Sequence, residues 1–245
     1  IKHLFLSLIL NIFNQMKKLL PLLLLILIGC SEPEPINMNE MLNERDDGYN
    51  RVFYTKDTNK PYSGPVFSFH ENVRPWEEGT LKGGKFDGPY KRYYENGKLE
   101  KEGTYLSGKK DGLWKFYNEY RIRESEIQSE KTYKNGLQDG PYKLNYYNNE
   151  RLKEEGTYQN GLQDGPYKRY YENIYGNKKG VGQLKQEGTY QYGFLDGYNI
   201  RYHENGQVRQ EGTFNNGRDG LWKFYNENGQ LQEERTYKNG KLINS

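Results

Sequence analysis

The sequence predicts an all-β protein, built as a single elongated and twisted antiparallel meander of β-hairpin repeats. The first observation is composition, since only 33% of the 245 residues are hydrophobic while the chain holds 24 tyrosines and 28 glycines. Aromatic side chains suit half-buried strands, and disordered chains are poor in them. The second is self-similarity, because Asp-Gly and Glu-Gly-Thr return about every 25 residues. The third is turn chemistry, as Asn-Gly pairs stand between aromatic runs.

We interpret residues 1–29 as a leader that contains a lipoprotein signal peptide. Two lysines after Met16 precede an apolar run that ends at Ile28. A run of this length is typical of a signal peptide and falls short of the ~20 residues that a membrane-spanning helix needs. Residues 1–15, which precede that methionine, are expected to be an over-extended start.

Cys30, the single cysteine of the chain, follows the apolar run directly in Leu27-Ile28-Gly29-Cys30. This ending resembles the lipobox of bacterial lipoproteins, in which the cysteine is acylated and becomes the first residue. Buried acyl CH₂ groups contribute ~0.8 kcal/mol each to membrane binding. We therefore predict lipidation at Cys30 and a location in the cell envelope, lipid-anchored to a bacterial membrane, with the inner and outer membranes both left open.

Residues 30–46 are acidic, contain proline and asparagine and show no period, so we expect a lipid-anchored flexible tether. Residues 47–245 are expected to hold about seven β-hairpin repeats. Repeat arrays end in atypical units that protect their pairing edges, and we expect Val52–Pro65 to be a degenerate first hairpin.

The unit Asp87–Tyr105 shows the expected hairpin in its fullest form. Its first strand, Pro89–Tyr94, leads to Glu95-Asn96-Gly97, where asparagine and glycine both accept positive φ. The second strand, Lys98–Tyr105, is followed by a second turn that is expected to include Asp111-Gly112. Repetition of this unit predicts one continuous antiparallel sheet.

Alternation along the strands predicts which residues share a face. Leu99 precedes Tyr105 by six residues, and an even interval places both on one face. Gly103 shares that face and leaves room for a neighbouring ring. Two aromatic positions of the first strand lie three residues apart and are expected on opposite faces. The second of these positions holds Tyr93, Tyr117, Tyr146, Tyr170, Tyr202 and Tyr225.

The remaining rings form the candidate binding surface. Cross-strand packing, at about 0.2–1 kcal/mol per pair, is the main interpretation of rings in such rows. The alternative is that one row binds an apolar or planar partner. The candidates for this role are Trp76, Tyr90, Trp114, Tyr142, Tyr167 and Trp222.

Charge and reactive side chains argue against several classes of function. Residues 1–29 hold three lysines and no acid, and the rest of the chain has as many basic as acidic residues. A near-neutral chain without a basic stripe is not expected to bind nucleic acid. His70 and His203 occupy an aromatic repeat position, and no nucleophile stands with a base. We expect no enzymatic activity, no metal and no cofactor.

The motif Tyr-Tyr-Glu-Asn-Gly-Lys-Leu, followed by Glu-Gly-Thr-Tyr, Asn-Gly and Asp-Gly, is carried by Tyr93–Tyr105 and Tyr133–Gly140. It resembles the MORN-repeat variant, and the chain is similar to the bacterial YwqK-type proteins called antitoxins. The resemblance covers about Asp47 to Ser245. It implies a twisted sheet of hairpins with roles in protein contacts, scaffolding or lipid association, and it implies no catalytic residues.

Three functions follow as hypotheses. The first is a non-catalytic, membrane-anchored repeat scaffold that mediates protein–protein interaction in the bacterial cell envelope, with the protein partner unidentified. The second is a cell-wall or glycan-binding module, because the segment from Trp222 to Gly229 resembles wall-binding repeats. The third is an antitoxin or immunity protein that its anchor positions against an incoming toxin.

Overall fold

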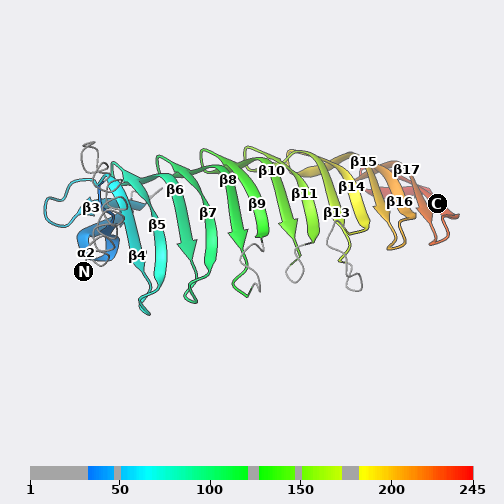
Figure 1. Ribbon diagram of the computed structural model, residues 1–245. Coiled ribbons are helices and arrows are strands. Elements are labelled where there is room, and N and C mark those ends of the chain that lie inside the picture. The colour runs from blue at the N-terminus through cyan, green and yellow to red at the C-terminus, as the bar shows by residue number, and fades with distance from the viewer. Residues whose placement is uncertain (1–32, 47–50, 121–126, 147–150, 173–181, 245) are drawn as a thin grey trace, which may run out of the picture. The chain divides into compact units, whose positions relative to one another are not determined.

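The computed structural model describes five stretches of the chain, residues 33–46, 51–120, 127–146, 151–172 and 182–244 (Figure 1). The chain divides into two compact units, residues 1–35 and 36–245. All helices and strands of the described residues lie in the second unit. The leader, Cys30 and the predicted over-extended start lie outside the described residues.

Strands make up nearly all regular structure of the described residues. One helix, α2 (Met38–Met41), accompanies a small sheet of β2 (Leu42–Asp46) and β3 (Arg51–Thr55). The main sheet has 17 strands in the described part of the chain. These are β1 (Ile36–Asn37), β4 (Gly64–Phe69), β5 (Pro75–Lys82), β6 (Lys85–Tyr93), β7 (Leu99–Leu106), β8 (Lys109–Tyr117), β9 (Ile127–Lys134), β10 (Leu137–Asn145), β11 (Leu152–Gln159), β12 (Leu162–Gln163), β13 (Gly165–Tyr170), β14 (Leu184–Gln191), β15 (Phe194–Tyr202), β16 (Val208–Phe214), β17 (Arg218–Tyr225), β18 (Leu231–Lys238) and β19 (Lys241–Asn244).

The predicted all-β fold is confirmed. From β4 onward the strands pair antiparallel in chain order, and both β12 and β13 pair with β11 because the two are pieces of one strand. Figure 1 shows these strands side by side from β4 to β17. The exception is β1, which pairs in parallel with β4. The sheet is one long meander of hairpins and does not close.

Short turns connect the hairpins along one edge of the sheet, most of them of two residues and the one between β16 and β17 of three. Ser107 and Gly108 join β7 to β8 with φ values of 50° and 83°, and two positive values define a type I′ turn that matches strand twist. Gly108 N donates to Phe86 O of the preceding hairpin at 2.7 Å. The carboxylate of Asp87 accepts a hydrogen bond from Ser107 N at 3.0 Å. The recurring aspartate thus ties one hairpin to the turn of the next.

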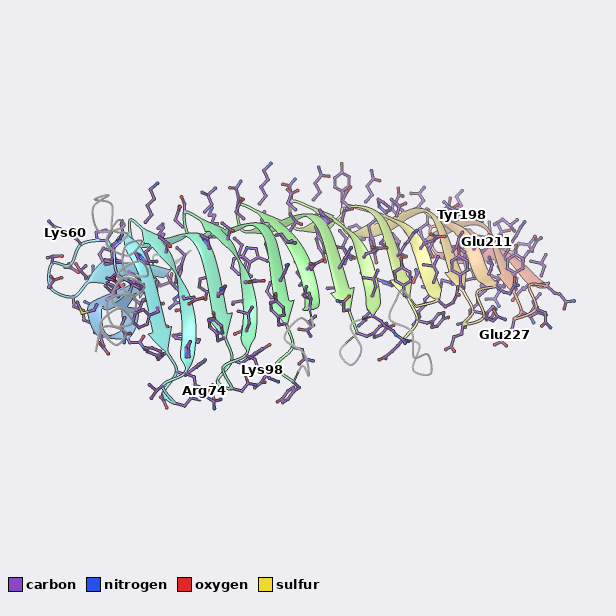
Figure 2. The ribbon with its side chains drawn as sticks, viewed as in Figure 1. Lys60, Arg74, Lys98, Tyr198, Glu211 and Glu227 are labelled. Atoms are coloured by element: carbon purple, nitrogen blue, oxygen red, sulfur yellow. The ribbon has the colours of Figure 1, made fainter. Side chains whose placement is uncertain are left out.

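The turns at the opposite edge are longer. The hairpin predicted at residues 95–97 is confirmed, but only its glycine, Gly97, has positive φ, at 83°. Gly97 N donates to Tyr94 O at 2.8 Å, and Tyr94 N donates to Lys98 O at 2.8 Å. Figure 2 shows Arg74, Lys98 and Glu227 along this edge, each near the turn of its own hairpin.

In the described part of the chain the Asp-Gly pairs lie within strands instead of in turns, except that Asp164 lies between β12 and β13. Asp111 and Gly112, which were expected to belong to a turn, lie inside β8, where Gly112 has a φ of 68°. The register between β7 and β8 shifts between Glu102 and Thr104, opposite this pair. A glycine is required at this bulge because residues with a Cβ rarely adopt such φ values.

A second bulge corrects the predicted face of the leucines. Tyr93 pairs with Leu99 after a register shift that leaves Glu100 unpaired. The Tyr93 hydroxyl donates to Glu78, on the face opposite to the one that Tyr105 occupies. Leu99 and Tyr105 therefore lie on different faces, because an extra residue at a bulge reverses the alternation that an even interval assumes.

The start of the second unit is folded, which corrects the predicted tether for residues 36–46. This segment forms β1, α2 and β2. Met38 and Leu42 are only 4% and 5% exposed and pack in one cluster with Phe53 and Leu81. These apolar side chains, which were predicted to belong to the tether, pack against residues of β4 and β5 such as Val66 and Leu81. Their burial is favourable because it removes apolar surface from water.

The segment Val52–Pro65, predicted as a degenerate first hairpin, folds back on itself in an irregular way, with Thr55 N donating to Lys60 O at 2.9 Å and Tyr62 N donating to Phe53 O at 3.0 Å. Its first half is β3, and β3 pairs with β2 in the small sheet. The two bonds within the segment flank an antiparallel bridge between Tyr54 and Pro61. The first full hairpin of the main sheet is β4–β5.

Rings cover glycines on one face of the main sheet. A Cβ at Gly103 would collide with the Trp114 ring, and a Cβ at Gly212 would collide with the Trp222 ring. The ring position therefore requires glycine on the paired strand, as the sequence predicted. We call this face the ring face, and its repeated ring position holds Tyr90, Trp114, Tyr142, Tyr167 and Trp222.

Candidate functional site

Five of the six predicted binding residues are buried in the ring face. Tyr90 and Tyr142 are 4% exposed, Tyr167 is 2% exposed, and Trp114 and Trp222 are fully buried. Neighbouring rings cover them, as the Tyr105 ring covers Trp114 with ring centroids 4.9 Å apart. Buried rings present no surface to a partner, so the structure supports packing as their role.

Trp76 is the predicted residue that keeps partial exposure. It lies on β5 at the bulge position of its hairpin, with the guanidinium carbons of Arg51 and Arg92 at 5.8 and 5.5 Å from its ring centroid. The His70 ring lies 6.1 Å away. A hollow of about 440 Å³ adjoins Trp76, lined also by Asn39, Phe69, His70, Glu71, Asn72 and Glu95.

The opposite face, here called the charged face, carries a row of alternating acids and bases. Residues that pair across neighbouring strands alternate between glutamate and lysine, with one isoleucine in the row. Directly opposed charges of opposite sign stabilise an antiparallel sheet by about 0.2–1 kcal/mol per pair. The row consists of Glu78, Lys91, Glu102, Lys115, Glu130, Lys143, Glu155, Lys168, Glu187, Ile200, Glu211, Lys223 and Glu234.

Tyrosine hydroxyls reinforce this row. The Tyr93 hydroxyl donates to the Glu78 carboxylate at 2.8 Å, and burial together with this bond raises the pKa of Tyr93. A phenol that donates to a carboxylate is held in its neutral form. The same contact recurs as Tyr117–Glu102 at 2.7 Å, Tyr170–Glu155 at 2.7 Å, Tyr202–Glu187 at 2.6 Å and Tyr225–Glu211 at 2.6 Å.

Tyr146 does not belong to this set, although the sequence placed it there. Asn145 pairs with Leu152 in the way that Tyr93 pairs with Leu99, so Tyr146 stands one position later. Its hydroxyl donates to Tyr170 O at 2.7 Å. At this later position, a tyrosine or histidine side chain forms a hydrogen bond with a backbone carbonyl of the next hairpin. Its other members with a bond of this kind are His70 to Tyr93 O, Tyr94 to Tyr117 O, Tyr171 to Tyr202 O and His203 to Tyr225 O.

Apolar side chains are exposed along the edge of the type I′ turns. A Cβ placed on Gly161 would lie 3.7 Å from Leu137, and one placed on Gly193 would lie 3.7 Å from Leu162, so each leucine lies beside the turn of the next hairpin. Exposed apolar surface of this kind is common at protein contact sites. We call this set the apolar edge, and its members are Leu137 (54% exposed), Leu162 (50%), Tyr192 (68%) and Phe194 (74%).

The row of rings is interrupted at Asn199, which is 2% exposed. Its Nδ2 donates to the Tyr167 hydroxyl at 2.7 Å, and Gln186 Nε2 donates to the same hydroxyl at 2.6 Å. These bonds satisfy buried polar groups that would otherwise cost about 1–3 kcal/mol each. The ring face is therefore polar between β13 and β15.

A groove of about 340 Å³ opens beside this polar stretch. Arg169 and Gln186 belong both to its wall and to the contacts around Tyr167, whose ring centroid lies 5.1 Å from the Arg169 guanidinium carbon. Three successive hairpins supply the rest of the wall. The residues of the described chain that line it are Tyr146, Lys153, Glu154, Arg169, Tyr170, Tyr171, Lys185, Gln186, Arg201, Tyr202 and Arg209.

The cations of this groove were not found from the sequence, although a signal is present. Lys153, Lys185 and Arg209 each follow the leucine-like residue that opens the second strand of a hairpin. A bulge places this position on the ring face, whereas simple alternation assigns it to the other face. Aligning the repeats by the bulge would have revealed three basic residues at one position in consecutive units.

No three His, Cys, Asp or Glu side chains in the described part of the chain gather as metal ligands do. No helix among these residues has the length and apolar character needed to cross a membrane.

Comparison with known proteins identifies three of the hairpins. No curated protein matches the chain. The family model described as the MORN repeat variant matches residues 86–106, 195–216 and 218–239. These segments correspond to the hairpins β6–β7, β15–β16 and β17–β18. At these three places the chain is similar to MORN repeat variants.

Proposed function

We propose that this protein is a non-catalytic repeat scaffold that binds another protein, and that acylated Cys30 anchors it to a bacterial membrane in the cell envelope. MORN repeats commonly serve in protein and membrane contacts, and three hairpins match that repeat. The anchor is supported by the lipobox-like residues from Leu27 to Cys30.

The observation that carries the protein-binding role is the apolar edge. Leu162 and Phe194 leave half or more of their surface in water, although the chain buries other rings almost completely. Burial at about 25 cal/mol per Å² makes covering such side chains favourable. A row of apolar side chains at the turns of consecutive hairpins suits a partner with an apolar strip of its own.

The test is capture of partners from envelope extract by the full chain, compared with a triple variant of the apolar edge, Leu137→Ser, Leu162→Ser and Phe194→Ser. The matched control is Leu113→Ser with Leu221→Ser, two leucines that are 51% and 48% exposed elsewhere on the sheet. We expect a partner that the wild-type chain and the control retain and the triple variant loses. Equal capture by all three proteins would contradict the role of this edge.

The anchor requires its own measurement. Cys30→Ser is expected to move the protein from the membrane fraction to the soluble fraction, because a single serine cannot carry the acyl chains that hold it there. Metabolic labelling with a fatty-acid analogue should mark the wild-type chain and not the variant. An unlabelled wild-type chain would contradict lipidation.

A further inference from the structure

The groove beside Tyr167 has an excess of positive charge. Its wall in the described chain includes five cations and one carboxylate, Glu154. Glu154 is already engaged, since Arg169 Nε lies 2.8 Å from one of its oxygens and the Tyr142 hydroxyl donates to the other at 2.6 Å. Four cations are left without that carboxylate as a partner, namely Lys153, Lys185, Arg201 and Arg209.

The repeat explains why these cations gather. Lys153, Lys185 and Arg209 occupy the bulge position in three consecutive hairpins, so the stacking of hairpins places them in a row. Arg201 comes from the facing strand, where it pairs with Gln186 on one side and with Gln210 on the other. Both of its cross-strand neighbours are neutral amides, which leaves its charge uncompensated within the sheet.

The same positions are compensated near the start of the sheet. There the bulge residue is Glu100, and Arg92 Nε lies 3.0 Å from its carboxylate. Arg51 likewise pairs with the buried Glu77 at 3.1 Å. In the described part of the chain, Arg201 and Arg209 have no ion pair of this kind. The bulge position can therefore hold an acid, as it does at Glu100, but it holds a base at each of the three hairpins of the groove.

Tyrosine rings hold two of the cations at the groove without neutralising them. The Lys153 ammonium lies 5.8 Å from the Tyr146 ring centroid, and the Lys185 ammonium lies 5.2 Å from the Tyr171 ring centroid. Both hydroxyls donate to backbone carbonyls, which fixes the rings. A cation–π contact leaves the charge of the ammonium group intact, so both lysines can still pair with a bound anion.

We propose that this groove binds a ligand that carries two or more phosphate or carboxylate groups. A volume of about 340 Å³ suits a small molecule or a short segment of a polyanion. The guanidinium groups of Arg201 and Arg209 can each bind an oxyanion through two parallel hydrogen bonds. A hollow lined by charges of one sign also concentrates counter-ions from solution. This function is separate from protein binding at the apolar edge.

The test is calorimetric titration of the full chain, in detergent, with tripolyphosphate and, separately, with citrate. The site variant is Arg201→Gln with Arg209→Gln. The control is Lys143→Gln with Lys168→Gln, which removes the same charge from the charged face of the same part of the sheet. We expect saturable binding of at least one anion, a loss of ~10-fold or more in affinity in the site variant, and a change under about 2-fold in the control.

Two outcomes would overturn the proposal. One is equal weakening of binding in the site variant and in the control, which would mean that only net charge matters. The other is absence of saturable binding to both soluble anions. A parallel sedimentation with phosphatidylglycerol vesicles separates the sources of the anionic group. Vesicle binding without binding to either soluble anion would assign these cations to a lipid surface and contradict a ligand groove. None of these results depends on capture of a protein partner.

Discussion

Two stretches of the ring face use the same backbone position in different ways. Between β6 and β8 the position holds Tyr90 and Trp114, with ring centroids 5.9 Å apart and Tyr105 packed on both. Between β13 and β15 it holds Tyr167 and Asn199, joined by a hydrogen bond of 2.7 Å. We call these the aromatic stretch and the polar stretch. The strand pairing is the same in both, so the hairpin does not require a ring in every unit.

The comparison shows how a uniform repeat acquires a local site. In the aromatic stretch, large rings fill the space above the glycines, and the buried Tyr90 hydroxyl donates to Glu77 at 2.6 Å. In the polar stretch, a shorter side chain at Asn199 forms hydrogen bonds with Tyr167 and Gln186. The groove with its cations lies beside this stretch. Variation at a few repeat positions therefore changes the chemistry of the face while the sheet is kept.

The largest expected effect comes from the aromatic stretch. Trp114→Ala should lower the free energy of unfolding by about 3–5 kcal/mol, because it removes a fully buried ring and leaves a cavity above Gly103. Leu113→Ala, at the adjacent and 51% exposed position, should change it by no more than about 0.5 kcal/mol. Urea unfolding followed by circular dichroism measures both. Equal losses would mean that the rings of this face do not carry its stability.

A smaller effect is expected in the polar stretch. Asn199→Ala should cost about 1–3 kcal/mol, since the Tyr167 hydroxyl loses one of its two buried donors. Tyr167→Phe removes the other member of the pair. The double variant should lose less than the sum of the two single variants, with a coupling of about 0.5–3 kcal/mol, because the two side chains share one contact. Strict additivity in the same urea experiment would show that the hydrogen bond contributes no net stability.

Most of this fold can be predicted from the sequence, because the signals that define the repeat lie within a single hairpin. These signals are the glycine of Glu-Gly-Thr, aromatic residues at fixed positions and Asn-Gly pairs. The structure of one unit therefore predicts the structure of the others. The bulge at Glu100 was not visible to a rule of simple alternation, and the face of Leu99 was wrong for that reason. Asp111 was expected in a turn but lies inside β8, and the equivalent Asp87 accepts a hydrogen bond from the turn between β7 and β8. Contacts between units follow from stacking and do not show in the pattern of one unit.

The candidate site was harder to predict from the sequence than the fold, for a related reason. The prediction selected Trp114 and Trp222 because they are aromatic. The presence of an aromatic residue alone does not show whether its ring is buried or exposed. The glycine opposite each ring was the physical sign of close packing, since it removes the one side chain that would keep the ring away from the sheet. Burial of these rings then leaves exposed residues such as Leu162 and Phe194 as the surface for which a contact role is proposed. The groove requires three hairpins at once, so the pattern of a single unit could not reveal it.

The smallest expected effect concerns the charged face and depends on pH. Glu211 accepts a hydrogen bond from Tyr225 at 2.6 Å and a second one from Tyr198, which lies beside it in Figure 2. For Tyr225 the bond to Glu211, with some burial, raises the pKa to about 12. Burial, and to a smaller extent the hydrogen bond to Glu211, also raises the pKa of Tyr198 to about 12. Near the start of the charged face, Glu78 on β5 accepts a single tyrosine hydroxyl, that of Tyr93, at 2.8 Å.

These raised values determine the direction of the pH effect. An unfolded tyrosine titrates near pH 10, so the folded chain binds more protons than the unfolded chain between pH 10 and about 12. The stabilising contribution is therefore complete below pH 10 and is lost as the pH rises through 12, where a phenolate would face the Glu211 carboxylate. Replacing both tyrosines, Tyr198→Phe with Tyr225→Phe, should flatten the fall in melting temperature between pH 9 and 11.5. Tyr192→Phe, at an exposed edge position, should keep the wild-type slope. An unchanged slope in the double variant would show that the paired contact at Glu211 does not distinguish the two ends of the sheet.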